Sequence, residues 1–208
     1  MYNNLYVGID PSINSTGVCT LVYDLDGELK EDRFYIIKNG KLTKKEQKAE
    51  LDNIDKFSYV LLERNTEADD NHELELNKTL YFINIVDSIK EIIGTTNYRH
   101  GRFCNIYVCI EGISYGSSQT KSVFDLAGLN FMIRSALIKY NIGITFELIV
   151  GTPGELKKFS TGKGNSAKDI IVNAFKAIYP NLNLPKVDDI ADAYFMANYI
   201  KKIKENDN

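Results

Sequence analysis

Two short apolar runs have the composition of buried β-strands, and each delivers a single carboxylate at its end. LYVGID ends on Asp10, and NIYVCIEG places Glu111 just before its glycine. Asp10 could simply start a turn, because Asp before Pro and Ser is ordinary turn chemistry. Glu111 could leave the core at the rim of the sheet and be solvated. An unpaired carboxylate at a buried strand end is otherwise costly, so a shared site is the alternative hypothesis.

The other patterns predict one mixed α/β domain over residues 1–208. VCTLVYDLDGELKEDRFYIIKNG reads as two further strands joined at Asp26-Gly27, so an antiparallel meander opens the fold. NIYVCIEG and ITFELIVG complete an expected five-stranded sheet. Residues 41–72 are an insertion of uncertain structure, in which 41–57 permits a helix and SYVLLERN could form a short strand.

Four segments with helical periodicity are expected to flank this sheet. The first spans 73–94, and KSVFDLAGLNFMIRSALIKY, SAKDIIVNAFKAIY and DDIADAYFMANYIKKI follow it. The apolar stripe over 122–139 is too wide for one packing face. It is consistent either with a fully buried core helix or with a helix at a subunit interface.

Composition limits the classes of function. At 208 residues, with 44% hydrophobic and 25% charged residues, the chain can bury a sizeable core as an ordinary globular protein. No run approaches the roughly 18 apolar residues of a membrane helix, and no signal peptide is evident, so we expect a cytoplasmic protein without a membrane partner. A net charge of -3 disfavours indiscriminate nucleic-acid binding but permits a local basic groove. The cysteines form no CxxC pair and are expected to be reduced packing residues: Cys19, Cys104 and Cys109.

The closing helical segment adds further acids. Asp188 is explained as a helix cap. Asp189 and Asp192, spaced i and i+3, lie on one side of the helix, where like charges require a cation between them. With Asp10 and Glu111 they form the oxygen-rich ligand set that Mg²⁺ or Mn²⁺ prefers. Phosphodiester hydrolysis by two metal ions is the chemistry that uses such a set.

Residues 151–168 carry four lysines against one acid, Glu155, and include glycines at 162 and 164. We interpret the segment as a flexible cationic loop that contacts phosphates beside the acids. A solvated lysine-rich loop is the simpler alternative. The candidate DNA-contacting lysines are Lys157, Lys158, Lys163 and Lys168.

Four motifs taken in order resemble the RuvC-like Holliday junction resolvases, especially the phage-type branch. They are GIDPSINSTG, IEGISYG, TPGELKKFSTGKGNSAKD and DDIADA, and the resemblance covers most of the chain except about 41–72. It implies an RNase H-like fold, a homodimer, and paired symmetric nicks in four-way DNA junctions with two Mg²⁺ ions, or Mn²⁺, per site. For a phage protein, the compartment would be the cytoplasm of the bacterial host.

The resemblance also assigns residues. Asp10 and Glu111 match the strand acids of the family, and Asp189 and Asp192 match its closing D-x-x-D, so these four are the expected metal ligands and catalytic acids. Lys168 matches a lysine near the scissile phosphate, and Lys157 matches a second basic residue of that segment.

The chain also departs from the family. Ser12 stands where the family often has Gly. The junction-wedging aromatic of the bacterial enzymes is replaced by Ser114, and Tyr115, one residue later, is the candidate for that role.

Three other functions remain open from the sequence. A flap or branch nuclease with loose specificity would use the same chemistry. An actin-like ATP-binding domain can share the opening motif, although no second phosphate loop is present. A catalytically silent junction-binding protein gains nothing from four acids that face phosphates.

Overall fold

The structure is a computed structural model that describes residues 3–101, 104–113, 121–140 and 144–207. Within these ranges one mixed sheet has the strand order β4-β3-β2-β1-β5-β6. Its strands are β1 (Asn4–Asp10), β2 (Ser15–Tyr23), β3 (Leu29–Asn39), β4 (Phe57–Leu62), β5 (Asn105–Glu111) and β6 (Thr145–Gly151). The helices are α1 (Lys44–Asp52), α2 (Asn71–Arg99), α3 (Lys121–Lys139), α4 (Pro153–Thr161), α5 (Lys168–Ile178) and α6 (Val187–Asn206).

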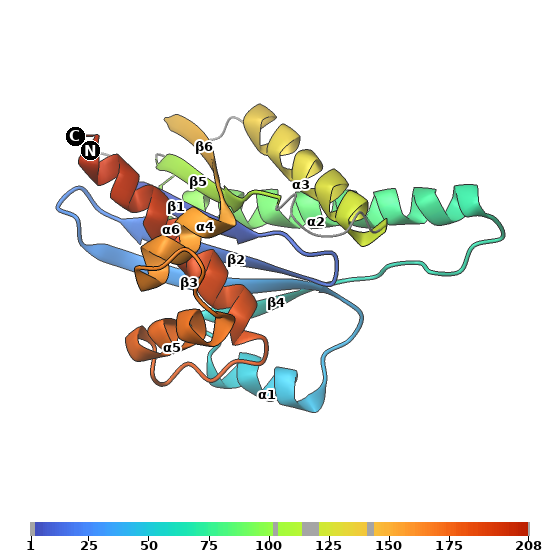
Figure 1. Cartoon of the computed structure of the whole chain (residues 1–208), viewed down its shortest axis with the longest axis horizontal. Coiled ribbons are helices and arrows are strands. Elements are labelled where there is room, and N and C mark those ends of the chain that lie inside the picture. The colour runs from blue at the N-terminus through green and yellow to red at the C-terminus, as the bar shows by residue number, and fades with distance from the viewer. Residues whose placement is uncertain (1–2, 102–103, 114–120, 141–143, 208) are drawn as a thin grey trace.

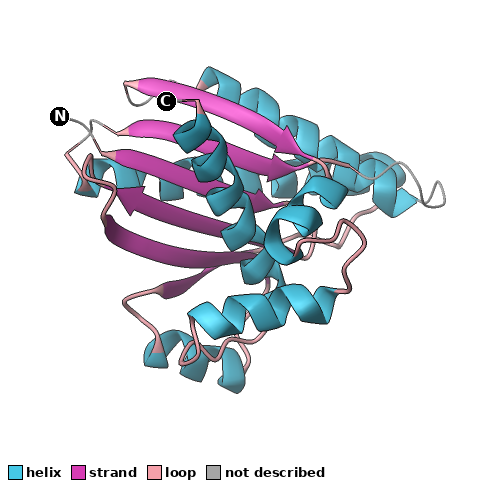
Figure 2. Ribbon diagram, turned by 60° about the vertical axis from the view of Figure 1, so that its left-hand side comes forward, coloured by secondary structure: helices cyan, strands magenta, loops and turns pink. Residues whose placement is uncertain are grey.

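Helices cover both faces of this sheet (Figures 1 and 2). Apolar residues of α2 and α3 pack on one face, and apolar residues of α1, α4, α5 and α6 pack on the other. No helix within the described ranges has both the length and the apolar character that a membrane span requires. The mixed α/β architecture expected from the sequence is confirmed.

The opening meander is confirmed strand by strand. β1 and β2 pair antiparallel, as do β2 and β3, and Gly27 adopts a positive φ of 81° in the turn between the last two. β5 pairs parallel to β1, and β6 pairs parallel to β5. Parallel pairing brings the carboxyl ends of β1, β5 and β6 to the same edge of the sheet.

The expected number of strands was wrong by one, because 57–62 forms a sixth strand. β4 pairs parallel with β3 from Phe34↔Phe57 to Asn39↔Leu62. A parallel neighbour requires a crossover connection, and α1 supplies it. A capping box starts that helix: Thr43 accepts a hydrogen bond from the Glu46 amide, and the Glu46 side chain accepts one from the Thr43 amide.

Two helices also differ from expectation. α2 continues to Arg99, beyond the predicted end near residue 94, because Thr96 and Asn97 are buried and the Asn97 side chain accepts a hydrogen bond from the Cys104 amide. Residues 153–161, interpreted as part of a flexible loop, form α4. The T-x-x-E capping box Thr152–Glu155 was the available signal for this helix.

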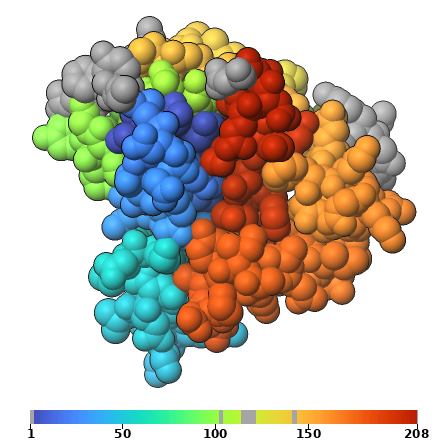
Figure 3. Space-filling model, turned by 90° about the vertical axis from the view of Figure 1, so that its left-hand side faces the viewer, coloured from blue at the N-terminus to red at the C-terminus, as the bar shows by residue number. Residues whose placement is uncertain are grey.

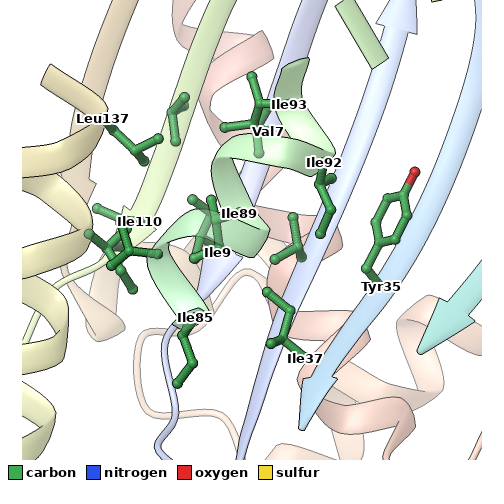
Figure 4. Packing of buried hydrophobic residues seen from close by; sticks show 14 of the residues in the cluster. Val7, Ile9, Tyr35, Ile37, Ile85, Ile89, Ile92, Ile93, Ile110 and Leu137 are labelled. Atoms are coloured by element: carbon green, nitrogen blue, oxygen red, sulfur yellow. The ribbon is translucent and has the colours of Figure 1, made fainter. Parts of the chain in front are cut away.

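One core cluster is built on α2. Ile85, Ile89, Ile92 and Ile93 are buried at helical spacing and lie against the strands, with Leu137 of α3 beside them (Figure 4). Cys104 belongs to this cluster, whereas Cys19 and Cys109 belong to the cluster on the opposite face. All three thiols are free and buried, as expected.

α6 lies unusually close to the centre of the sheet. A Cβ atom added at Gly8 of β1 would stand 1.9 Å from the Ala193 carbonyl oxygen, and one at Gly17 of β2 would stand 2.3 Å from the Asp189 carbonyl oxygen. Real Cβ atoms do not approach backbone oxygens to these distances. Glycine is therefore required at both positions for α6 to hold its place.

We expect Gly8→Ala to destabilise the protein by about 3 kcal/mol or more, because the new methyl group forces α6 away from the sheet. Urea unfolding followed by circular dichroism measures this loss. Gly128→Ala is the matched control: Gly128 is exposed on α3 with no atom within 4 Å of the added Cβ. It should be neutral or stabilising by about 0.5–1 kcal/mol. Equal effects of the two substitutions would contradict the packing argument.

Candidate active site

Two of the predicted acids meet at the carboxyl ends of neighbouring central strands. Asp10 is the last residue of β1 and Glu111 the last residue of β5. The parallel register pairs Ile9 with Ile110, so the two acids follow at the next position of each strand. Their side chains are joined by a hydrogen bond. The structure therefore brings these two acids into direct contact.

The other two acids reach the same place from α6. Asp189 lies in the first turn of the helix, where its carboxylate accepts a 2.6 Å hydrogen bond from the Ser15 hydroxyl at the start of β2. Asp192 follows one turn later. Both are partly buried, and both act electrostatically on Asp10. The close packing of α6 on β1 and β2 thus places its acids against the strand ends.

Crowding of the four carboxyls changes their protonation. Burial, followed by the charges of Glu111, Asp192 and Asp189, raises the pKa of Asp10 well above its usual value. Burial also raises the pKa values of Glu111 and Asp189. The pKa of Asp192 rises to about 6, again mainly through burial. Ionising all four groups together is unfavourable without added positive charge.

Lys168 supplies part of that charge. It is the first residue of α5, and its ammonium group lies 2.9 Å from Asp188 and 4.0 Å from Asp192. Asp188 is therefore an ion-pair partner at the site. The prediction that Asp188 is the helix cap was wrong, because the N-cap residue is Lys186; Asp188 instead lies in the first turn of α6, where an acid is favoured by the helix dipole.

A cavity of about 180 Å³ opens beside these groups. Glu111 and Asp192 contribute acids to its wall, while Lys157 of α4 and Lys168 of α5 contribute ammonium groups. The rest of the wall is largely apolar, and includes Leu156, Ile171, Phe195 and Met196. Anionic and cationic side chains from three helices and one strand therefore share one concave surface.

The remaining residues predicted to contact DNA are not all found at this cavity. Lys158 and Lys163 are exposed and do not line the cavity. Ser114 and Tyr115 lie outside the described residues. Sequence reasoning missed Ser15, whose only signal was its position in the opening motif.

A divalent cation would find only oxygen ligands here. Among the ranges that the structure describes, no three His, Cys, Asp or Glu side chains are already arranged as a metal-binding group. The acids are instead satisfied by protein groups: Asp10 and Glu111 by each other, Asp189 by Ser15, and Asp192 by Lys168. The four carboxyls still match the hard, oxygen-only donor set of Mg²⁺ or Mn²⁺.

Comparison with solved structures identifies the fold. The Thermus thermophilus RuvC structure matches with a TM-score of 0.57 and 14% identity, covering 96% of each chain. T. thermophilus RuvC in complex with a Holliday junction substrate gives 0.55 and 13%, covering 97% of this chain and 96% of that one. The human cytomegalovirus terminase nuclease domain gives 0.41 and 14%, covering 94% and 82%. No family model and no curated protein matches the sequence. The two RuvC matches, with TM-scores above 0.5, show the RNase H-like fold that the resemblance of the motifs implied.

We expect Asp10→Asn to stabilise the protein in EDTA at about pH 8. A carboxyl whose pKa is raised in the folded protein destabilises the fold when it ionises. The free energy of unfolding therefore falls as the pH rises from about 4, the pKa of such a group in the unfolded chain, through the raised pKa of the folded protein. The amide removes one of these charges and can still donate a hydrogen bond to Glu111, so the gain should be about 1–2 kcal/mol.

Thermal unfolding between about pH 5 and pH 8 provides the measurement. Asp55→Asn, at an exposed acid between α1 and β4, is the control and should leave the unfolding temperature unchanged at both ends of this pH range. A gain for Asp10→Asn that stays constant across this pH range would refute the electrostatic explanation.

Proposed function

We propose that this chain is a metal-dependent endodeoxyribonuclease that selects branched DNA and resolves four-way junctions by paired symmetric nicks. The cavity that joins Glu111 and Asp192 to Lys157 and Lys168 is the observation that carries the proposal. Acids that hold a metal and lysines that bind phosphate must share one surface in such an enzyme. The RNase H-like fold supports this reading, and one of the matching structures is T. thermophilus RuvC in complex with a Holliday junction substrate.

In this proposal Asp10, Glu111, Asp189 and Asp192 hold two divalent ions. Bound Mg²⁺, or Mn²⁺ in its place, would lower the pKa of the attacking water and stabilise the leaving oxygen. Ser15 holds the Asp189 carboxylate in position through its hydrogen bond. The buried surroundings limit the number of water molecules that compete for the carboxylates.

The lysines position the DNA. The Lys168 ammonium group, held at the rim by Asp188 and Asp192, binds a non-bridging oxygen of the scissile phosphate. Lys157, which also lines the cavity, contacts the same or the adjacent phosphate. Exposed Lys158 and Lys163 extend the contact along the backbone. These contacts position the strand without reading its bases. A location in the cytoplasm, that of the bacterial host for a phage protein, is part of the same proposal.

A homodimer would present two such sites to the two symmetric strands of a junction. α2 and α3 provide the surface for it. Between them lies an apolar groove of about 490 Å³ that includes Ile83, Phe131 and Met132. Leu76 and Leu80 of α2 are also exposed. An exposed apolar patch of this kind is typical of a protein interface.

We expect the purified protein with Mg²⁺ to cut a labelled four-way junction at symmetric positions. Asp10→Asn should lower the cleavage rate at least ~100-fold and leave junction binding intact, because a metal ligand is lost and a charge that repels DNA is removed. Asp169→Asn, at an exposed acid of α5, is the matched control and should cleave normally.

Tests of the same protein on junctions, forks, flaps and ATP distinguish the candidate functions. Equal cleavage of forks and flaps would favour the loosely specific branch nuclease. Tight binding with no cleavage under Mg²⁺ or Mn²⁺ would favour the silent junction-binding protein. ATP binding with no DNA binding would favour the actin-like alternative.

We expect Phe131→Asp to convert a wild-type dimer into a monomer, because the Phe131 side chain is 57% exposed and would be buried between subunits. Analytical ultracentrifugation measures the mass. Leu51→Asp is the control, since Leu51 of α1 is 71% exposed and lies on the other face of the sheet. A monomeric wild-type protein, or dissociation by both substitutions, would exclude this interface.

A further inference from the structure

Helix α1 turns two of its three acids, Glu46 and Glu50, toward the protein, whereas Asp52 is exposed. Glu46 is buried, and its carboxylate accepts a 2.7 Å hydrogen bond from the Lys38 ammonium group. The Glu50 carboxylate accepts a 2.7 Å hydrogen bond from the Tyr59 amide of β4. Both charges are thereby directed at the sheet, although the sequence of α1 contains equal numbers of basic and acidic residues.

The lysines of α1 point the other way. Lys44, Lys45 and Lys48 are exposed, and none forms an ion pair with a residue that the structure describes. Lys48 lies four residues after Lys44 and three after Lys45, so it neighbours both of them on the exposed side of the helix. This exposed side, Lys44, Lys45 and Lys48, is called the α1 lysine face.

A cavity of about 320 Å³ adjoins this face. Lys45 and Lys48 line it from α1, and Asn181 and Asn183 line it from the loop between α5 and α6. One acid, Asp52, also lines it. Ammonium groups and side-chain amides are donors for phosphate oxygens, so the donors outnumber the single repelling carboxylate.

The α1 lysine face lies on the same side of the sheet as the acid site. Ala49 of α1 packs in the core cluster that contains α4, α5 and α6. The chain around residue 50 lies directly against the chain around 170–185, which leads into α6 (Figure 3). The surfaces are therefore continuous through the loop that precedes Asp188.

A short series of contacts joins the two places. Asp189 accepts a hydrogen bond from Ser15, Ser15 is the register partner of Lys38, and Lys38 holds Glu46 of α1. α1 is thus fixed to the end of the sheet that borders the acids, and it lies on the opposite side of the acids from α4.

A DNA duplex whose scissile phosphate lies at the acids would therefore have basic groups on both sides of that phosphate, those of α4 on one side and those of α1 on the other.

We propose that the α1 lysine face binds the phosphate backbone of a second stretch of the same DNA substrate, the duplex that extends from the acid site toward α1. This inference rests on the proposed nuclease function. The contact adds affinity through phosphate neutralisation and carries no sequence preference, because it involves no base edges.

The test compares Lys45→Gln/Lys48→Gln with the matched pair Lys30→Gln/Lys202→Gln. Lys30 and Lys202 are exposed at the opposite end of the sheet, at the start of β3 and near the end of α6. Binding to a labelled four-way junction is measured in EDTA, so that no strand is cut, over a series of salt concentrations.

The Lys45→Gln/Lys48→Gln variant should bind the junction roughly ten- to fifty-fold more weakly than wild type at low salt. The slope of the logarithm of the binding constant against the logarithm of the salt concentration should fall in magnitude by about 2, one unit for each lost phosphate contact. The loss should be the same for junctions of different sequence. The control pair should stay within about two-fold of wild type. Asp52→Asn should have the opposite effect and tighten binding, which excludes misfolding as the explanation.

Two outcomes overturn the inference, and they differ. If wild type binds and cuts junctions while the α1 pair keeps its full salt slope, the α1 lysine face is not a DNA contact and the proposed nuclease function stands. If wild-type protein neither binds nor cuts branched DNA, the proposed function fails and this inference fails with it.

Discussion

The close contact of α6 with the centre of the sheet is the constraint on which the candidate site depends. Gly8 and Gly17 leave no side chain between strand and helix, so the backbones approach to distances that a methyl group would forbid. Without this approach Asp189 and Asp192 would lie farther from the strand acids, and the four carboxyls would be separate surface charges. The buried alanines of α6, Ala193 and Ala197, serve the same purpose from the helix side.

Concentrating four acids creates a cost that the surrounding chain partly offsets. A shared hydrogen bond, a serine hydroxyl and one lysine each satisfy part of the cluster, yet the pKa of Asp192 still rises to about 6. Four neighbouring carboxyl groups destabilise the fold, so stability alone does not explain their placement together. Perturbed carboxyls beside a cavity are a recognised mark of functional sites, and here they coincide with the lysines that phosphate binding requires.

Much of this could be predicted from residues alone, and the failures have physical reasons. Period-two and helical patterns predict elements whose packing faces are apolar. The predictions of the meander and of α6 were therefore correct. α2 extends past its apolar pattern because a buried polar residue, Asn97, accepts a hydrogen bond from the Cys104 amide beyond the end of the helix. SYVLLERN permits a short strand, but no local pattern encodes its pairing with β3 across a crossover, so β4 was not counted in the expected sheet. Asp188 was misassigned because a helix cap and an ion-pair partner look alike until Lys168 is placed in space.

The four acids come from positions 10, 111, 189 and 192, and this distribution matters during synthesis on the ribosome. Until α6 has left the exit tunnel, a nascent chain contains the strand acids but not the helix acids, so the complete cluster cannot form. While the sheet assembles, only the repulsion between Asp10 and Glu111 is present, and the contributions of Asp189 and Asp192 are added when α6 docks onto Gly8 and Gly17. Partly synthesised chains can therefore fold their central strands without the full electrostatic cost, and without the complete ligand set.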